Sequence, residues 1–306
     1  MSLNIENKFI VLKKTSTIEV QGDERIHFLQ GQLTQDICLI TKDQAQYAGF
    51  CNPKGRLLAF MLCYARNDAI HIQIDTSIEE SILKRLKMYL LRSKVSINLL
   101  LNAFIKIGFI SSKGFENKGI KLPKKYLEIT TFDNVMIIRL SQNHDRYQIM
   151  GEAKAVDSFI ALAFSDFELM DEDEWNNKII LDGIPEIYPS TQETFIPQSL
   201  NIDLMEGINF KKGCYTGQEI VARTHYLGKV KRRMYRAFIE SQVSLVPGDV
   251  ITNESNEEIG QLVRSSKETN VKTNLLIELR VDQMNETLNI KNYLITLCPE
   301  DKKRFS

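Results

Sequence analysis

The sequence lacks the compositional features that mark nucleic-acid-binding proteins, membrane proteins and secreted proteins. Its 39 Lys and Arg residues equal its 39 Asp and Glu residues, so no net charge draws it to RNA or to lipid. No apolar run approaches the roughly 20 residues that span a bilayer. Residues 1–8 are polar and have no signal-peptide core. We therefore expect a cytoplasmic protein that has no membrane partner.

Patterns for metal and nucleotide binding are also missing. The five cysteines lie far apart without a C-x-x-C pair, and the four histidines fall at no metal-binding spacing, so we expect no metal site. An odd number of cysteines without a signal peptide is typical of a reducing compartment. Neither of the glycine-rich loops that hold nucleotide phosphates occurs. Any chemistry must therefore come from other side chains.

The hydrophobic pattern predicts an α+β protein with largely antiparallel sheets. Short alternating segments at 17–20, 46–50, 57–62, 70–74, 104–110, 135–140 and 146–150 read as strands, and hairpin turns separate several of them. Helical spacing follows Asp23 and recurs at 78–90 and 152–164. Strands, helix, strands and helix in that order favour α+β layers over a doubly wound parallel sheet. From about 228 onward, short strand-like segments predict a separate small β-barrel.

One segment carries most of the chemical information, the octapeptide Lys212-Gly213-Cys214-Tyr215-Thr216-Gly217-Gln218-Glu219. Its two glycines allow a tight turn and a close approach by another molecule. The cations at 211 and 212 favour a thiolate, and a helix that starts at Gln218 favours an anion. A single cysteine is more often a small buried hydrophobe, but this setting predicts a reactive Cys214 that Lys212 keeps ionised.

The same segment resembles the signature of the bacterial YgfZ-type folate-binding family, within the superfamily of the glycine-cleavage aminomethyltransferases. The resemblance extends to three other segments, at 195–201, 29–36 and 52–56. It implies two interleaved α+β modules over residues 1–227, with a boundary near 100–113, and a β-barrel over 228–306. It further implies a tetrahydrofolate or related folate in a central channel, and iron–sulfur proteins, including enzymes that thiolate tRNA, as clients.

Trp175, the only tryptophan, is the candidate platform for the pterin ring. Its flat face can stack on an aromatic ligand, and the resemblance places the family's folate-binding tryptophan at the same spacing before Asp182-Gly183-Ile184-Pro185. A core tryptophan is the alternative from the sequence alone. A second aromatic that the family has near its N-terminal strand falls at Thr15 here, and Tyr47 or Phe50 are the substitutes.

Polar candidates complete the expected folate site. We assign Gln198, Gln218 and Glu219 to it, the last two also shaping the cysteine loop, although amides such as Gln198 often only satisfy loop backbones. The superfamily's transferases read the pterin with a carboxylate, which accepts paired hydrogen bonds from an amino-pyrimidine edge. Asp182 is the only acid in the corresponding stretch, 178–182. The apolar residues beside it argue against a complete transferase site.

Five cations fall within eight residues, namely Lys229, Lys231, Arg232, Arg233 and Arg236. They either meet RNA, a polyglutamate tail or an acidic partner, or belong to a charged strand that enters the barrel. Three functions stay open: a folate-binding protein that assists iron–sulfur cluster synthesis or repair, a tetrahydrofolate-dependent aminomethyl transferase, and an adaptor without enzymatic activity that binds protein or RNA. Contact with nucleic acid is compatible with the first function but not required by it.

Overall fold

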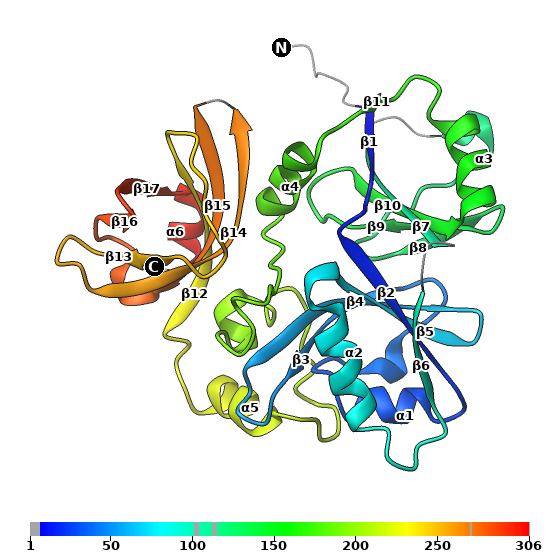
Figure 1. The fold of residues 1–306 in the computed structure, drawn as a ribbon, viewed down its shortest axis with the longest axis horizontal. Coiled ribbons are helices and arrows are strands. Elements are labelled where there is room, and N and C mark those ends of the chain that lie inside the picture. The colour runs from blue at the N-terminus through cyan, green and yellow to red at the C-terminus, as the bar shows by residue number, and fades with distance from the viewer. Residues whose placement is uncertain (1–6, 101–103, 112–114, 270, 306) are drawn as a thin grey trace.

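Two β-sheets and a closed barrel make up the computed structural model (Figure 1), which describes residues 7–100, 104–111, 115–269 and 271–305. Helices and mostly antiparallel strands are mixed along the chain, as the expected α+β class requires. Short 3₁₀ helices join some of these elements: η1 (Ile37–Leu39), η2 (Thr76–Ile78), η3 (Glu116–Lys118), η4 (Pro197–Leu200) and η5 (Val281–Gln283).

The first sheet has five strands in the order β3 (Gln46–Cys51), β4 (Leu57–Arg66), β5 (Ala69–Asp75), β2 (Thr15–Gln21) and β6 (Ser96–Leu100). Helices α1 (Arg25–Gln30) and α2 (Glu79–Met88) supply apolar side chains to the buried cluster on one of its faces. The β3–β4 turn closes where the amide of Gly55 donates to the Asn52 carbonyl at 2.9 Å, as the Asn-Pro-Lys-Gly sequence predicts.

The second sheet has six strands in the order β11 (Glu168–Leu169), β1 (Asn7–Val11), β7 (Phe104–Ser111), β10 (Arg146–Glu152), β9 (Val135–Arg139) and β8 (Ile129–Phe132). Helix α3 (Ala153–Ala163) covers one face through Val156 and Phe159. Because β1 precedes the first sheet in sequence but pairs with β7 of the second, the chain crosses between the two modules. This crossing makes them interleaved, as expected.

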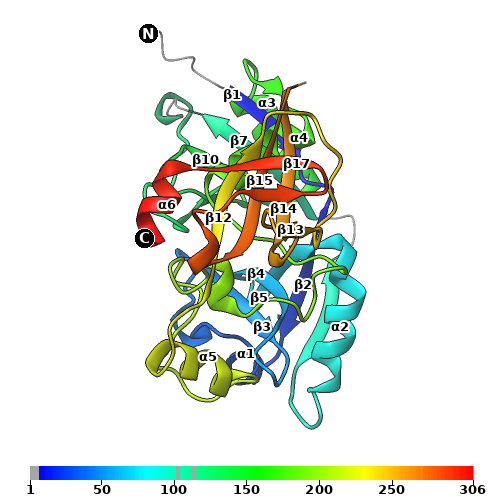
Figure 2. The same ribbon diagram turned by 90° about the vertical axis from the view of Figure 1, so that its left-hand side faces the viewer.

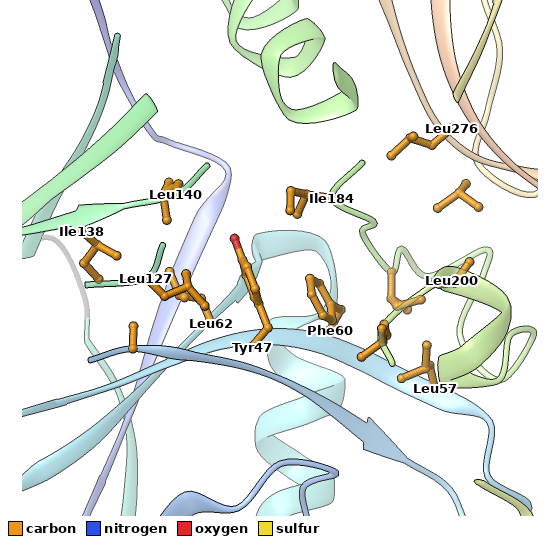
Figure 3. Close-up of a cluster of buried hydrophobic side chains, with 14 of the residues drawn as sticks. Tyr47, Leu57, Phe60, Leu62, Leu127, Ile138, Leu140, Ile184, Leu200 and Leu276 are labelled. Atoms are coloured by element: carbon orange, nitrogen blue, oxygen red, sulfur yellow. The ribbon is translucent and has the colours of Figure 1, made fainter. Parts of the chain in front are cut away.

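A third buried cluster joins the uncovered faces of the two sheets. Tyr47 and Phe60 of the first sheet meet Met150 and Trp175 there, together with loop residues such as Ile184. Figure 3 shows the Tyr47 ring extending from β3 toward Leu140 and Ile184 with Phe60 beside it. The two sheets are therefore joined by an apolar cluster whose residues come from widely separated segments.

The C-terminal barrel (Figure 2) closes in the order β12 (Arg232–Ile239), β15 (Lys272–Arg280), β14 (Glu258–Thr269), β13 (Val250–Thr252), β16 (Leu288–Ile290) and β17 (Tyr293–Leu297). Helix α6 (Pro299–Phe305) is tied to β12 by the ion pair of Arg236 with Asp301, 2.7 Å long. Helix α4 (Glu172–Leu181) docks on the barrel, since Asn177 donates to the Lys267 carbonyl at 2.7 Å.

The expected module limits can be placed on these elements. The first barrel strand begins at Arg232, shortly after the expected limit at 228. The expected boundary near 100–113 falls partly on residues 101–103 and 112–113, which lie outside the described residues. Within the described part of the chain, no helix is both long enough and apolar enough to cross a membrane.

Candidate functional site

A cavity of about 1190 Å³ lies where the two sheets, α4 and the barrel meet. Residues from all four parts line it, so no single segment of the sequence defines it. The residues that carry its chemistry are Tyr47, Phe60, Gln73, Arg146, Gln148, Trp175, Asn176, Glu186, Arg264 and, at the rim, Lys13, Lys14 and Lys267. Its mixture of aromatic and polar walls is typical of a pocket for an organic ligand.

Trp175 lines this cavity from α4, a helix that Asp171 caps by accepting from the Glu174 amide at 2.8 Å. The indole is only 5% exposed. A Cβ added at Gly108 on β7 would lie 2.7 Å from the indole carbons Cζ2 and Cη2, so the ring rests directly on that strand. The Arg146 guanidinium lies over the indole, 5.2 Å from its centroid. Trp175 is thus both a packed residue and a cavity wall.

Asp182 does not offer a free carboxylate to a ligand. Its Oδ2 accepts from Arg146 Nε at 2.6 Å, and its Oδ1 accepts from the Ser141 hydroxyl at 2.5 Å and contacts His144 Nδ1 at 2.7 Å. Because these partners occupy both oxygens, Asp182 holds Arg146 in place over Trp175. The hypothesis that Asp182 reads a pterin edge is therefore replaced by a positioning role.

Thr15 stands where the family has an aromatic residue, but two aromatic residues of the first sheet lie at the cavity. Tyr47 and Phe60 stack with centroids 4.8 Å apart and planes inclined by 22°, and both line the cavity. Burial raises the pKa of Tyr47 to about 12, so its hydroxyl stays protonated at neutral pH. Phe50 belongs to the buried cluster beneath α1 and α2. Of the two proposed substitutes, only Tyr47 lies at the cavity.

Glu186 is the acid that the sequence reasoning missed. It lines the cavity just after the Gly183-Ile184-Pro185 turn, and burial raises the pKa of its carboxyl to about 7. Arg264 of β14 faces the same space, with Nη2 bonded to Asn176 Oδ1 at 3.1 Å and Nε without a hydrogen-bond partner among the described residues. An acid directly following a glycine–proline turn was the available signal.

Two amides connect the sheets at the cavity wall. Gln73 on β5 and Gln148 on β10 exchange hydrogen bonds through their side chains, at 2.7 and 3.2 Å. Each amide can still donate or accept once more, because a primary amide has two donors and two acceptor lone pairs. This pair holds the two modules in register next to the cavity.

The cysteine loop lies outside the cavity lining, and Cys214 is exposed. Gly217 adopts a φ of +84°, and a Cβ there would lie 2.5 Å from the Asn52 carbonyl oxygen, so this position requires glycine. Gly213 has open space where a Cβ would be. Helix α5 (Gln218–Tyr226) begins immediately after Gly217, as the sequence predicts. The loop therefore presents Cys214 to solvent from a fixed base.

Lys212 is buried and makes structural contacts. Its ammonium donates to the carbonyls of Gln30, Leu33 and Gln35 at 2.8, 2.6 and 2.9 Å. Burial lowers its pKa to about 8, against the opposing effects of Asp36 and Cys38. Its charge is thus directed at residues 30–38. The expectation that Lys212 keeps Cys214 ionised stays a prediction, and these contacts give it no support.

The three polar candidates for folate binding lie away from the cavity lining. Gln198 is buried and donates to the Val221 carbonyl at 2.6 Å, which fixes α5 against η4. Gln218 and Glu219 stand in the first turn of α5, where Glu219 is exposed. A ligand in the cavity would not contact them, because the cavity is walled by other segments. These three assignments stay predictions, and the polar residues that the structure places at the cavity are Arg146, Glu186 and Arg264.

Acidic partners neutralise the arginines of the basic cluster. Arg232 pairs with Glu278 at 2.8 Å, and Arg233 and Arg236 pair with Asp203 and Asp301, each at 2.7 Å. The three arginines therefore belong to a charged strand of the barrel, which was one of the two interpretations, whereas Lys229 and Lys231 precede this strand and are exposed. Among the residues that the structure describes, no three His, Cys, Asp or Glu side chains are grouped as metal ligands.

The chain resembles known proteins in sequence and in fold, although no family model matches it. It is 30% identical over 229 residues to the "tRNA-modifying protein YgfZ" of Hamiltonella defensa, covering 74% of this chain and 68% of that protein. It is also 30% identical to the protein of that name from Colwellia psychrerythraea, over 82% of this chain and 78% of the relative.

Among solved structures, the glycine cleavage system aminomethyltransferase T from Bartonella henselae superposes with a TM-score of 0.74 over 96% of this chain and 85% of that one. At 10% identity this match shows the fold alone. The shared fold agrees with the interleaved modules and barrel described above. The sequence identity to the two relatives extends over most of their length, and on that ground this chain belongs to the YgfZ family.

Proposed function

We propose that this protein binds a tetrahydrofolate in the central cavity and supports tRNA modification by assisting the synthesis or repair of iron–sulfur clusters. The observation that carries the proposal is the cavity itself, in which aromatic walls face an acid and an unpaired arginine nitrogen. The relatives are named as tRNA-modifying proteins. The client enzymes are implied by the family resemblance, and the reactive cysteine is inferred from the glycines, the cations and the helix start around Cys214.

The residues at the cavity fit the parts of a folate. Tyr47 and Phe60 give a stacked aromatic wall for a flat pterin. Glu186 can accept paired hydrogen bonds from an amino-pyrimidine edge once it is ionised. Lys13, Lys14 and Lys267 at the rim suit the carboxylates of a glutamate tail, although Lys14 also pairs with Glu172 at 2.7 Å. The bound folate would supply a carrier for one-carbon units.

Trp175 takes part in this site through a pair with Arg146. Since the strand at Gly108 and the guanidinium both lie against the indole, the ligand meets the Trp175–Arg146 pair and not a free indole face. Asp182 keeps the guanidinium in position from behind. The charge next to the indole orients polar atoms of the ligand, and the buried ring excludes water from that wall.

Cys214 serves the second half of the proposed function. One thiolate cannot hold a whole cluster, because such sites generally use about four cysteine ligands. The buried cysteines, Cys51 and Cys63, have a pKa raised to about 12 by burial and lie inside the first module, so they are poor partners for an exposed site. Transient contact with a client through an exposed thiol suits Cys214 better than storage of a cluster.

Titration of the protein with tetrahydrofolate tests the first half directly. With a single tryptophan at the cavity wall, ligand binding should change its emission. Tyr47→Ala keeps the reporter and should weaken binding by roughly 1 kcal/mol, the value of one aromatic stacking contact. Cys214→Ser, outside the lining, is the matched control and should bind as the wild type does. A calorimetric titration that shows no binding to the wild type would refute the proposal.

Complementation tests the second half. Cells that lack the protein should regain the activity of an iron–sulfur tRNA-thiolating enzyme when they receive the wild type but not when they receive Cys214→Ser. The variant should fold normally, since it changes one exposed atom. Full rescue by Cys214→Ser would make this cysteine dispensable and would contradict the assignment.

A one-carbon transferase is the second candidate, and Glu186 favours it. Such an enzyme needs a carboxylate close to the reactive part of the folate, and this acid lies in the cavity with a pKa near neutrality. Incubation with tetrahydrofolate and an aminomethyl donor should then give a folate loaded with one carbon, and Glu186→Gln should abolish its formation. If the wild type forms none with any donor amine, the binding role stands without catalysis.

A further inference from the structure

Helix α5 and the loop before it expose a fixed cluster of aromatic rings. Phe210 and His225 stack with centroids 3.7 Å apart and planes inclined by 11°. Tyr226 meets both rings edge-on, at 6.2 and 4.7 Å, and its hydroxyl donates to the Phe210 carbonyl at 3.4 Å. Tyr226 is nevertheless 63% exposed and the adjacent Leu227 is 84% exposed. These rings are held in place yet reach solvent.

Exposed cations flank these rings along the chain. Lys211, Arg223, Lys229 and Lys231 are all exposed. In contrast to Arg232, Arg233 and Arg236, their side chains form no ion pair with the residues that the structure describes. Within 210–231 the only acid is Glu219. The turn that carries the exposed Lys54 packs against the start of α5, where Gly55 contacts Ile220, and adds a further cation.

We propose that this surface, formed by Phe210, His225, Tyr226 and the exposed cations that flank them in the chain, binds a single-stranded segment of RNA at the helix that follows the Cys214 loop. It shares no residue with the lining of the central cavity, so the proposal does not depend on folate binding. Exposed rings on which bases stack, next to cations that meet phosphates, are how proteins bind single strands without reading their sequence.

The chemistry of the surface favours RNA over an acidic protein. An acidic peptide would use the cations alone and would leave the tyrosine and histidine rings without a partner. A base has a π-face for these rings, and its phosphate follows at the spacing of one nucleotide. The rings are also fixed by their mutual contacts, which lowers the entropy lost on binding.

Fluorescence anisotropy with a labelled single-stranded RNA of ~12 nucleotides, a length within the usual site sizes, measures the interaction. Tyr226→Ala should bind at least about fivefold more weakly, and Tyr226→Phe should retain binding because it keeps the ring. Lys229→Ala/Lys231→Ala should lower the slope of log K against log salt by about 1.4, since each phosphate contact on a single strand contributes about 0.7. Lys84→Ala/Lys87→Ala, two exposed cations on α2, should leave both quantities unchanged.

Three results would overturn the proposal. The wild type could fail to bind the RNA even at low salt, or the α5 variants could bind as well as the wild type while retaining their thermal stability. Equal losses in Tyr226→Ala and Tyr226→Phe would show that the hydroxyl acts and that stacking does not. If RNA does not bind but the same variants abolish capture of a purified client protein, the surface is a protein interface.

Discussion

Gly108→Ala is the sharpest test of how the structure positions Trp175. A Cβ at this position would lie 2.7 Å from Trp175 Cζ2 and Cη2 and 2.9 Å from Cε2. Ordinary contacts of a Cβ begin near 3.4 Å, so the indole or the strand must move by about 0.7 Å. The indole is rigid and 5% exposed, and β7 is paired on both sides, by β1 and β10. Overpacking of this kind costs about 1–3 kcal/mol.

Chemical denaturation and the emission of the single tryptophan measure this effect together. The variant should unfold at lower denaturant concentration with an unchanged m-value, because the same surface is exposed on unfolding. Its tryptophan emission should shift, since the ring must move relative to the Arg146 charge. Affinity for tetrahydrofolate should fall as the displaced ring enters the cavity. Gly213→Ala is the matched control, because a Cβ there meets open space.

A Gly108→Ala variant with the stability and the emission of the wild type would contradict this expectation. The indole would then not rest on β7. If stability falls but tetrahydrofolate affinity is unchanged, Trp175 is a core residue only and the ligand binds elsewhere in the cavity. Equal losses in both glycine variants would point to a general effect of removing glycine.

Three further predictions concern buried and exposed titratable groups. Lys212→Ala should lower the free energy of unfolding by about 2 kcal/mol or more in urea titrations, because three carbonyls lose a charged donor. Lys211→Ala, which changes the exposed neighbour, should leave the free energy of unfolding unchanged. A larger loss of stability in Lys211→Ala than in Lys212→Ala would contradict the structure. Glu186 has a pKa raised from 4.5 to about 7, so its proton is held more tightly in the folded state and stability is lost as pH rises through 7. Glu186→Gln should therefore have a higher melting temperature than the wild type at pH 8 but not near pH 4.5. The affinity of the wild type for tetrahydrofolate should fall below pH 7, whereas the affinity of the variant should not change with pH. Iodoacetamide should label Cys214 before Cys51 and Cys63, whose pKa burial raises to about 12; mass spectrometry of the labelled peptides decides the order.

Local patterns in the sequence were sufficient for most of the secondary structure. The alternation at 46–50 and 57–62 and the Asn-Pro-Lys-Gly turn correspond to β3, β4 and their hairpin. The strands β1, β8, β11 and β16 were not predicted. Each is short, and two of them, β8 and β11, lie at sheet edges, where pairing with a distant partner stabilises a strand without a strong pattern of its own.

The candidate site residues also differ in how far local patterns in the sequence could predict them. Cys214, its exposed loop and the helix after it follow from local glycine and helix signals, and the family resemblance depends on the same segment. Trp175 became a candidate only through the family resemblance, which places a folate-binding tryptophan at this spacing before the Gly-x-Pro turn. By contrast, Asp182 and Lys212 are charged residues whose partners lie 36 and up to 182 residues away, so their positioning roles could not be predicted from neighbours in the chain.

The sequence by itself determined the α+β class, the barrel tail and the exposed cysteine loop, because these depend on periodicity and on turn residues within a few positions of each other. Only the tertiary structure decided which side chains share the cavity. Tyr47, Arg146, Glu186 and Arg264 come from β3, β10, the loop after α4 and β14, and only the docking of two sheets and the barrel brings them together. The same docking places Gln198, Gln218 and Glu219 outside the cavity lining. This could not be predicted, because contacts between distant segments leave no periodic signal in the chain.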